Sequence, residues 1–167
     1  MDAPVRIEPY DPSWPIRFEI ERALIAGAIA PWLIGPIEHI GSTAVPGLAA
    51  KPVIDIMAGV ESLEASRPAI EPLKALSYCY APYRANEKHW FCKPSPEMRT
   101  HHLHLVPAGS AMWEEHIAFR DILRANAGVA SEYAELKRRL AEIYRNDRDG
   151  YTDAKAPFIA RILRERG

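Results

Sequence analysis

The sequence predicts an α+β domain in which a sheet of about five strands is flanked by helices and followed by a helical half. Short strand-like segments gather between residues 36 and 106, whereas residues 108–167 show helical patterns. Strands and helices that are segregated in this way are typical of α+β folds rather than of a doubly wound sheet. The chain has 167 residues, of which 48% are apolar, so it is long enough to bury one core. We therefore predict one domain over 1–167, with an extended arm over 1–14.

The first half of the chain is predicted from turn residues and apolar spacing. Its elements are, in order, a Pro-rich arm over 5–14 anchored by Tyr10 and Trp14, a helix from Pro15 to Ile29, strands over 36–41 and 53–59, and a helix that begins at Ser62. The connection between the two strands is long and contains Pro46, Gly47 and Pro52. A long irregular connection inside a compact domain is usually functional, so we expect a functional loop here.

The second half is predicted to complete the sheet and then to form three helices. Strands are expected over 77–83, 89–93 and 100–106, and helices are expected to begin at the caps Ser110, Ser131 and Thr152, with a break at 126–128. Side chains alternate between the two faces of a strand. His102 and His104 are therefore expected on one face, and His101 on the other.

The composition excludes several classes of protein. The formal net charge is −1 and charged residues make up 26% of the chain, so there is no basic excess to recruit a nucleic acid. No apolar run approaches the ~18 residues that span a membrane, and the start of the chain lacks a signal core. Cys79 and Cys92 lack zinc-ligand spacing, and we interpret them as buried free thiols. These features predict a cytoplasmic protein that binds neither nucleic acid nor membrane.

The stretch from Ile37 to Met57 carries a resemblance to known families. An apolar strand, Gly41-Ser42, about a dozen residues and then an acid on a second strand resemble the pattern of the nucleotidyltransferase superfamily. More narrowly, His39–Ile56 resembles the GrpB family, also called UPF0157, and so do Pro9–Pro15, Arg99–Leu105 and Tyr151–Ile159. The resemblance implies a nucleotidyltransferase-like fold with a mixed sheet.

The phosphate-binding candidates are Gly41, Ser42 and Thr43, because a strand end of this kind can offer backbone N–H groups and hydroxyls to a phosphate. The alternative is a simple turn that closes the strand. Asp55 is the candidate ligand for a divalent metal, most naturally magnesium, because a carboxylate between two isoleucines is costly unless it is paired or bound to metal. The alternative is an ion pair with Lys51 or an arginine. The superfamily pattern expects a second acid where this chain has Met57.

Two histidines are the candidates to complete this site. His102 and His104 could bind a metal with Asp55, or could act as a base and a phosphate donor. The alternative is a hydrogen-bonded pair packed on the sheet. The remaining candidates are Lys51, Arg99 and Lys155 for phosphate, and Glu38 and His39 as supporting groups. Lys155, on the last helix, could fold back over the pocket. Glu38 could supply a carboxylate near the site or could pair with Arg99.

The leading functional hypothesis is a nucleotidyltransferase-like protein that binds a nucleotide and magnesium and transfers a nucleotidyl group to a small acceptor. One alternative is a non-catalytic accessory domain, since the resemblance includes domains fused to dephospho-CoA kinase. Another is a different phosphate chemistry run by Asp55 and the two histidines. In each case the expected partner is a small nucleotide or phosphorylated ligand, and the sequence does not indicate an oligomeric state. We expect Ser42, Asp55, His102 and His104 to converge on one open pocket.

Overall fold

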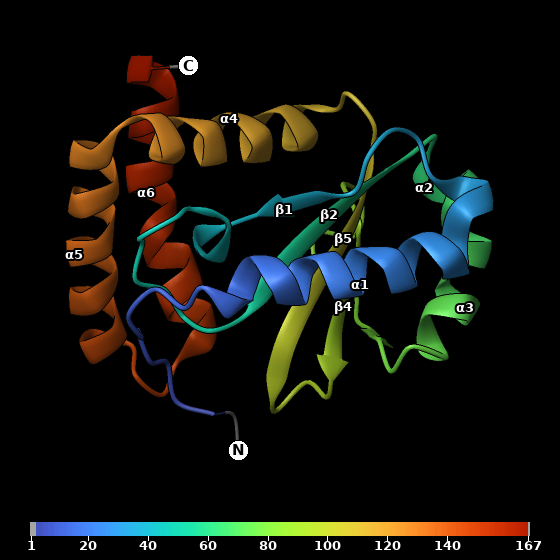
Figure 1. Ribbon diagram of the computed structural model, residues 1–167, viewed down its shortest axis with the longest axis horizontal. Helices are drawn as coiled ribbons and strands as arrows, with labels where there is room; N and C mark the ends of the chain where they lie inside the picture. The colour runs from blue at the N-terminus through green and yellow to red at the C-terminus, as the bar shows by residue number, and fades with distance from the viewer. Residues whose placement is uncertain (1–2, 167) are drawn as a thin grey trace.

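The computed structural model describes residues 3–166, so Met1 and Asp2 of the predicted arm lie outside the described residues. Its centre is a five-stranded sheet with the spatial order β1-β2-β5-β4-β3 (Figure 1). The strands are β1 (Glu38–Ile40), β2 (Ile54–Val60), β3 (Cys79–Tyr80), β4 (His89–Pro94) and β5 (Arg99–Pro107). The pair β2–β5 is parallel and the other neighbours are antiparallel. The predicted mixed five-stranded sheet is therefore confirmed.

The helices confirm the predicted α+β class and the predicted order of elements. They are α1 (Ser13–Ile29), α2 (Leu63–Ser66), α3 (Ile70–Lys74), α4 (Ala111–Ala125), α5 (Ala127–Ile143) and α6 (Arg148–Arg166). In Figure 1, α1 crosses in front of the sheet. The helices α5 and α6 lie next to each other at the left of the view, on the side of the sheet where β1 lies. The predicted cap residues Ser62 and Ser110 each accept a hydrogen bond from a first-turn N–H group, as N-caps do. No helix among residues 3–166 is long and apolar enough to cross a membrane.

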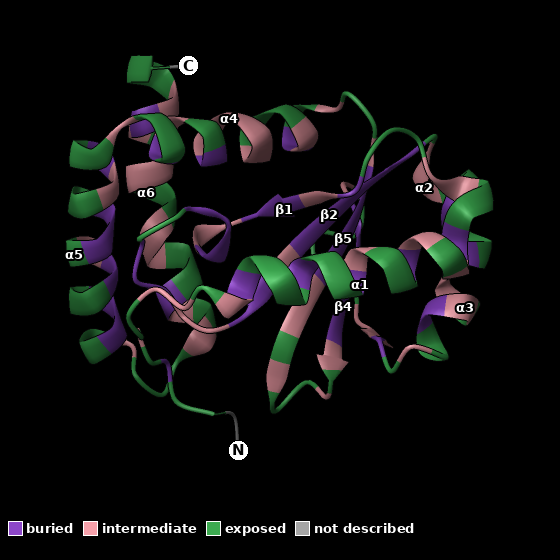
Figure 2. Ribbon diagram, in the orientation of Figure 1, coloured by how far each residue is buried: buried purple, intermediate pink, exposed green. Residues whose placement is uncertain are grey.

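The two faces of the sheet carry separate apolar clusters, which Figure 2 shows as buried strands between the helices. Ile54, Ile56 and Ala58 of β2 pack with α1 in the larger cluster. Met57, between them in sequence, packs in a smaller cluster with Met112 of α4 and its neighbours. Alternate residues of β2 therefore point to opposite faces, as strand geometry requires. The face that bears Met57 is also the face of Asp55.

The predicted functional loop and the N-terminal arm connect the sheet to the C-terminal helices. Val45 and Leu48 of the loop are buried against α4, α5 and α6. Val5 of the arm is buried with residues of α5 and α6, and Glu8 forms a bridge with Ala50. Trp14 is 1% exposed and so anchors the end of the arm, although it already lies in the first turn of α1. Both segments therefore help to position the helical half beside the strand ends.

Three other predicted boundaries are also wrong, each for a local reason. Ser131 lies inside α5 and caps nothing, because α5 already begins at Ala127. The break before it is only a corner, where the side-chain amide of Asn126 donates to a carbonyl of α4. The last helix begins at Arg148 instead of Thr152, because Asp147 accepts from the backbone N–H of the first turn. The strand predicted over 77–83 pairs over only two residues, between Ser77 and Arg84, which both have positive φ.

Cys92 is buried and Cys79 is half-buried, and both thiols are free. The prediction of free thiols is confirmed for both cysteines. The prediction of burial is wrong for Cys79, because β3 forms the outer edge of the sheet and cannot be covered on that side.

Candidate functional site

Asp55 lies at the centre of the candidate site, near the start of β2. It is paired with Ile40 of β1 on one side and with His102 of β5 on the other. Its Oδ1 atom is 3.4 Å from His102 Nδ1 and 3.1 Å from His104 Nε2. Burial raises the pKa of Asp55, but the hydrogen bonds from the two histidines outweigh burial and hold that pKa well below its ordinary value. The structure thus brings the predicted Asp55, His102 and His104 together around an ionised carboxylate.

Both ring nitrogens of His104 have hydrogen-bond partners. Lys88 Nζ lies 3.0 Å from His104 Nδ1, and because an ammonium group can only donate, Nδ1 must be the acceptor. The hydrogen therefore sits on Nε2, which donates it to Asp55. Burial, followed by the nearby charge of Lys88, lowers the pKa of His104 to about 3, so the ring is neutral at neutral pH. Neither ring nitrogen of His104 is left to bind a metal.

His102 makes only one polar contact among the described residues. Its Nδ1 faces Asp55, whereas its Nε2 is buried and has no hydrogen-bond partner. The Trp90 ring lies 5.2 Å from the imidazole, between centroids, and the Arg99 guanidinium lies 5.0 Å above the Trp90 ring. Burial lowers the pKa of His102 despite the opposing effect of Asp55. The two predicted histidines therefore differ, because His102 still has a ring nitrogen without a hydrogen-bond partner and His104 does not.

The predicted Gly41-Ser42-Thr43 turn lies directly against Asp55. Gly41 has φ +73°, and a Cβ placed there would be 2.9 Å from Asp55 Oδ2, so only glycine fits this approach. The hydroxyl of Thr43 lies 2.9 Å from His39 Nε2 and donates to Val53 O at 3.4 Å. That hydroxyl accordingly holds the turn against the start of β2. The side chain of Ser42 lies near the phenol of Tyr133.

His39 and Glu38 support the turn from β1. His39 stacks on Phe18, with ring centroids 4.7 Å apart, and burial lowers its pKa to about 4. A neutral His39 can donate from Nε2 to the turn. Glu38 does not supply a carboxylate to the site, nor does it pair with Arg99, which the sequence left open. It pairs instead with Arg120 of α4 at 2.6 Å.

The predicted basic residues Lys51 and Lys155 meet around one ring. The Lys51 and Lys155 ammonium groups lie 5.6 and 4.6 Å from the centroid of the Tyr151 ring. Burial, followed by the charge of Lys155, lowers the pKa of Lys51 to about 8. Burial also lowers the pKa of Lys155, whereas the charge of Asp55 acts to raise it. The last helix therefore does return a lysine to the neighbourhood of Asp55.

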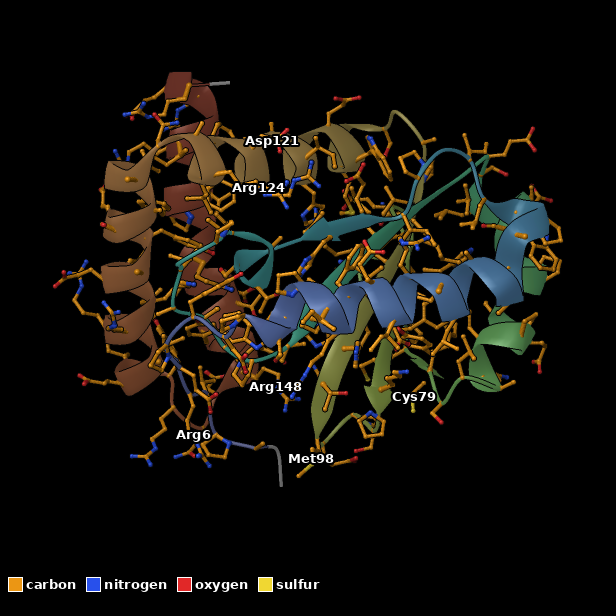
Figure 3. All side chains as sticks on the ribbon, viewed as in Figure 1. Arg6, Cys79, Met98, Asp121, Arg124 and Arg148 are labelled. Atoms are coloured by element: carbon orange, nitrogen blue, oxygen red, sulfur yellow. The ribbon has the colours of Figure 1, made fainter. Side chains whose placement is uncertain are left out.

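A cavity of about 280 Å³ opens beside this group, at the N-terminal ends of β2 and β5. It is lined by the arm, the β1–β2 loop, the start of β5 and the start of α6, through Ala3, Pro4, Val5, Arg6, Glu8, Lys51, Pro52, Val53, Met98, Arg99, His102 and Arg148. Figure 3 shows Arg148 and Arg6 below α1 and toward the C-terminal helices, and Met98 at the turn of the β4–β5 hairpin. Of the four residues expected to share one pocket, His102 lines this cavity, and Ser42, Asp55 and His104 do not.

The donor set does not fit a resident pair of magnesium ions. Met57, at the position of the second acid, is fully buried in the cluster packed on α4. No group of three His, Cys, Asp or Glu side chains among residues 3–166 is placed to hold a metal ion. Both nitrogens of His104 are already engaged, and magnesium prefers oxygen ligands to imidazole. Of the three predicted ligands, Asp55 is the one that offers oxygen, and the prediction of a divalent metal stays untested.

Sequence reasoning missed several residues that shape the site. Two of them contact His104, namely Lys88, whose Nζ lies 3.0 Å from Nδ1, and His116 of α4, whose ring centroid lies 5.6 Å from that of His104. Lys137 of α5 is 1% exposed and donates to Ala49 O at 2.8 Å. Burial, followed by the charge of Lys155, lowers the pKa of Lys137 to about 6. A charged residue on an apolar helix face was the available signal for Lys137, and no sequence signal pointed to Lys88.

Comparison with known proteins identifies the family. A family model described as GrpB protein matches residues 4–165. A UPF0157 protein of Pseudomonas aeruginosa is 40% identical over 166 residues, which cover 97% of this chain and 67% of that protein. The glutamate-rich protein GrpB of Alkalihalophilus pseudofirmus is 39% identical over 158 residues, which cover 92% of this chain and 90% of that protein. A dephospho-CoA kinase of Mycolicibacterium paratuberculosis is 28% identical over 184 residues, which cover 94% of this chain but 44% of the kinase.

Solved structures show the same relationship in three dimensions. The crystal structure of GrpB from Enterococcus faecalis matches with a TM-score of 0.86 at 33% identity and covers 96% of each chain. The GLD-2/RNP-8 complex matches with a TM-score of 0.54 at 13% identity, over 88% of this chain and 58% of that one. Cid1 in complex with its short product ApU matches with a TM-score of 0.52 at 11% identity, over 78% of this chain and 42% of that one. These last two structures confirm a nucleotidyltransferase-like fold, and the chain belongs to the GrpB family.

Proposed function

We propose that this protein binds the phosphate chain of a nucleotide, or of another small phosphorylated ligand, beside Asp55 and without a resident metal. The observation that carries the proposal is the excess of basic side chains around the site. Among the described residues, the cavity is lined by Arg6, Lys51, Arg99 and Arg148 but by only one carboxylate, Glu8. Charge of one sign in a partly closed site attracts ligands of the opposite sign.

The energetics of the lysines support an anionic ligand. The pKa of Lys51 falls from 10.5 to about 8, which corresponds to roughly 3 kcal/mol of unfavourable free energy for its charged form. Burial is the larger cause and repulsion from Lys155 the next. A phosphate between the two ammonium groups would offset both effects. The binding free energy of such an anion would therefore include the relief of a cost that the unbound protein carries.

The fold suggests which phosphorylated ligand to test first. Cid1, which shares the fold, was crystallised with the dinucleotide ApU. The turn of residues 41–44 follows β1 and touches Asp55, so it lies where a phosphate could approach both the turn and the lysines. These observations favour nucleotides over other phosphate esters. Nucleotidyl transfer by two metal ions needs a second acid at the position where this chain buries Met57.

Calorimetric titration and thermal unfolding with ATP, GTP, CTP, UTP and inorganic triphosphate test the proposal. Each ligand is measured once in EDTA and once with magnesium. We expect binding and a higher melting temperature in EDTA, because a ligand bound only by the native state stabilises it. Lys155→Met should weaken binding, while the control Lys74→Met, at an exposed lysine paired with Glu71, should not. No binding of any of these ligands at millimolar concentration would refute the proposal, and binding that requires magnesium would refute its metal-free form.

A further inference from the structure

The unpartnered nitrogen of His102 sets it apart from other buried polar atoms. Among the described residues, buried side-chain nitrogen or oxygen atoms without a hydrogen-bond partner occur at Ser13, His89 and His102. Of these, only His102 lines the cavity beside Asp55. A buried polar atom without a partner is unfavourable and rare, so it calls for an explanation. A ligand group that donates a hydrogen bond to this nitrogen would supply one.

The contacts of His102 determine which nitrogen carries the hydrogen. Asp55 is ionised and can only accept, so the ring nitrogen facing it, Nδ1, carries the hydrogen of the neutral imidazole. Nε2 is then left with its lone pair. His104 has the opposite arrangement, since Lys88 donates to its Nδ1 and Nε2 donates to Asp55. One carboxylate thus orients two histidines, and only His102 keeps a lone pair that is not already used.

We propose that His102 Nε2 is the proton acceptor of this site, and that it takes the proton of a hydroxyl group which attacks the bound phosphate. The hydroxyl belongs to water or to a small alcohol. This proposal rests on the proposed function, because it requires a phosphate ester or anhydride in the cavity.

The attack of the hydroxyl on phosphorus needs no reactant other than the hydroxyl compound and the bound phosphate ester or anhydride. The hydroxyl O–H bond breaks, its proton goes to Nε2, and the oxygen forms a bond to phosphorus with its electron pair. The bond from phosphorus to the leaving oxygen breaks, and the electron pair leaves with that oxygen. The resulting His102 imidazolium donates from Nδ1 to Asp55, which stabilises its charge, and it returns the proton to the leaving oxygen. A carboxylate that orients and stabilises an imidazole is a recurrent arrangement in general-base catalysis.

Two measurements on the wild-type protein test this assignment. Long-range nitrogen–proton NMR correlations identify the tautomer of each histidine at neutral pH. Diethyl pyrocarbonate, which acylates an accessible neutral imidazole nitrogen, measures the reactivity of each ring when the sites of modification are located by tandem mass spectrometry. We expect hydrogen on Nδ1 of His102 and on Nε2 of His104. His102 Nε2 and the His104 ring are both buried, so each is modified only when the site opens; we expect His102, which lines the cavity, to react about tenfold faster than His104, whose modification must also break its bond to Lys88.

Two variants separate the roles of the histidines. Lys88→Met should free Nδ1 of His104 and raise the reactivity of His104 toward that of His102, while the tautomer of His102 stays unchanged. Asp55→Asn should mix the tautomers of His102. Hydrogen on Nε2 of wild-type His102, or a reactivity no greater than that of His104, would overturn the proposal.

The same reagent distinguishes this proposal from the proposed function. If ATP binds in EDTA and slows the acylation of His102, the binding function and the proton-acceptor role of His102 both stand. If ATP binds while His102 is unreactive, the proton-acceptor role is wrong and the binding function stands. If ATP neither binds nor protects a reactive His102, the proposed function is wrong, and the proton-acceptor role, which requires a bound phosphate, is wrong with it.

Discussion

Met57→Asp restores the second acid of the superfamily pattern, and the structure predicts that it destabilises the protein instead of building a metal site. Met57 is fully buried and packs with Ile40, Val106 and Met112. Its neighbour across the parallel pair is His104, whose two nitrogens are already engaged. A carboxylate at this position would therefore be buried with no partner among the described residues.

The loss of stability expected for Met57→Asp has two parts. Loss of a fully buried methionine side chain removes roughly 1.5–3 kcal/mol of apolar burial. The new acid must also stay protonated, and holding an aspartic acid neutral at pH 7, against an ordinary pKa of about 3.9, costs about 4 kcal/mol. The sum approaches the whole stability of an ordinary domain, which is about 5–15 kcal/mol. Because the folded-state pKa is raised, the second part is absent below the ordinary pKa and grows as the pH rises.

Urea unfolding at several pH values, with Met57→Asn as the matched uncharged control, measures both parts. The Met57→Asn control should lose the free energy of apolar burial, and its stability should depend on pH in nearly the same way as that of the wild type. The difference between the two variants should grow by about 1.4 kcal/mol per pH unit above pH 4. If Met57→Asp unfolds together with the control at pH 7 and binds magnesium more tightly than wild type, position 57 faces an open metal site and our account of the packing is wrong.

Three further predictions concern charge. Folding lowers the pKa of His39 to about 4 and that of His104 to about 3. The free energy of unfolding is therefore unaffected by these two groups above pH 6.5 and falls below it, by about 2 kcal/mol for each histidine at pH 5. Urea unfolding should show this loss, and His39→Gln should remove about half of the loss. Asp55→Asn should fold with a loss of only about 1–2 kcal/mol, since the amide is nearly isosteric and its oxygen still accepts from His104. It should tighten triphosphate binding in EDTA by calorimetry, and weaker binding would contradict the metal-free site. Arg120→Met should cost about 2–3 kcal/mol by thermal unfolding, because it removes donors to Glu38 and to the carbonyl of His39, and an unchanged melting temperature would contradict this.

Much of the fold could be predicted from the sequence because local patterns agreed with tertiary packing. Alternation over 100–106 correctly separated His102 from His101, which contacts Glu21 of α1 on the other face. Boundaries failed where a side chain outside the expected element made the cap. Asp147 starts α6 earlier than Thr152 could, and two residues with positive φ shorten β3, and neither effect can be read from periodicity.

The candidate site was predictable in its members more than in their roles. The spacing of the histidines and the position of Asp55 were enough to place all three together, because register follows once β2 and β5 are paired. The hydrogen-bond partners were not predictable. Thr43 was expected to face phosphate, but its hydroxyl is engaged by His39 and the backbone, and Glu38 is drawn away by Arg120. The contacts of Thr43 are local, within ten residues along the chain, whereas Glu38 meets Arg120 across 82 residues, and strand periodicity predicts neither kind of contact.

Under the proposed function, the charges around Asp55 take over the work that a second acid and its metal ions do elsewhere. In a two-metal site, clustered carboxylates are needed because they hold metal ions, and the metal ions in turn neutralise phosphate. Here Lys51 and Lys155 already place fixed positive charge near Asp55, within the electrostatic reach that shifts their own pKa values. A second carboxylate would cancel part of that charge without a metal to hold. The buried Met57 is therefore compatible with a site that neutralises phosphate through lysine and arginine side chains, and it leaves Asp55 to orient the two histidines.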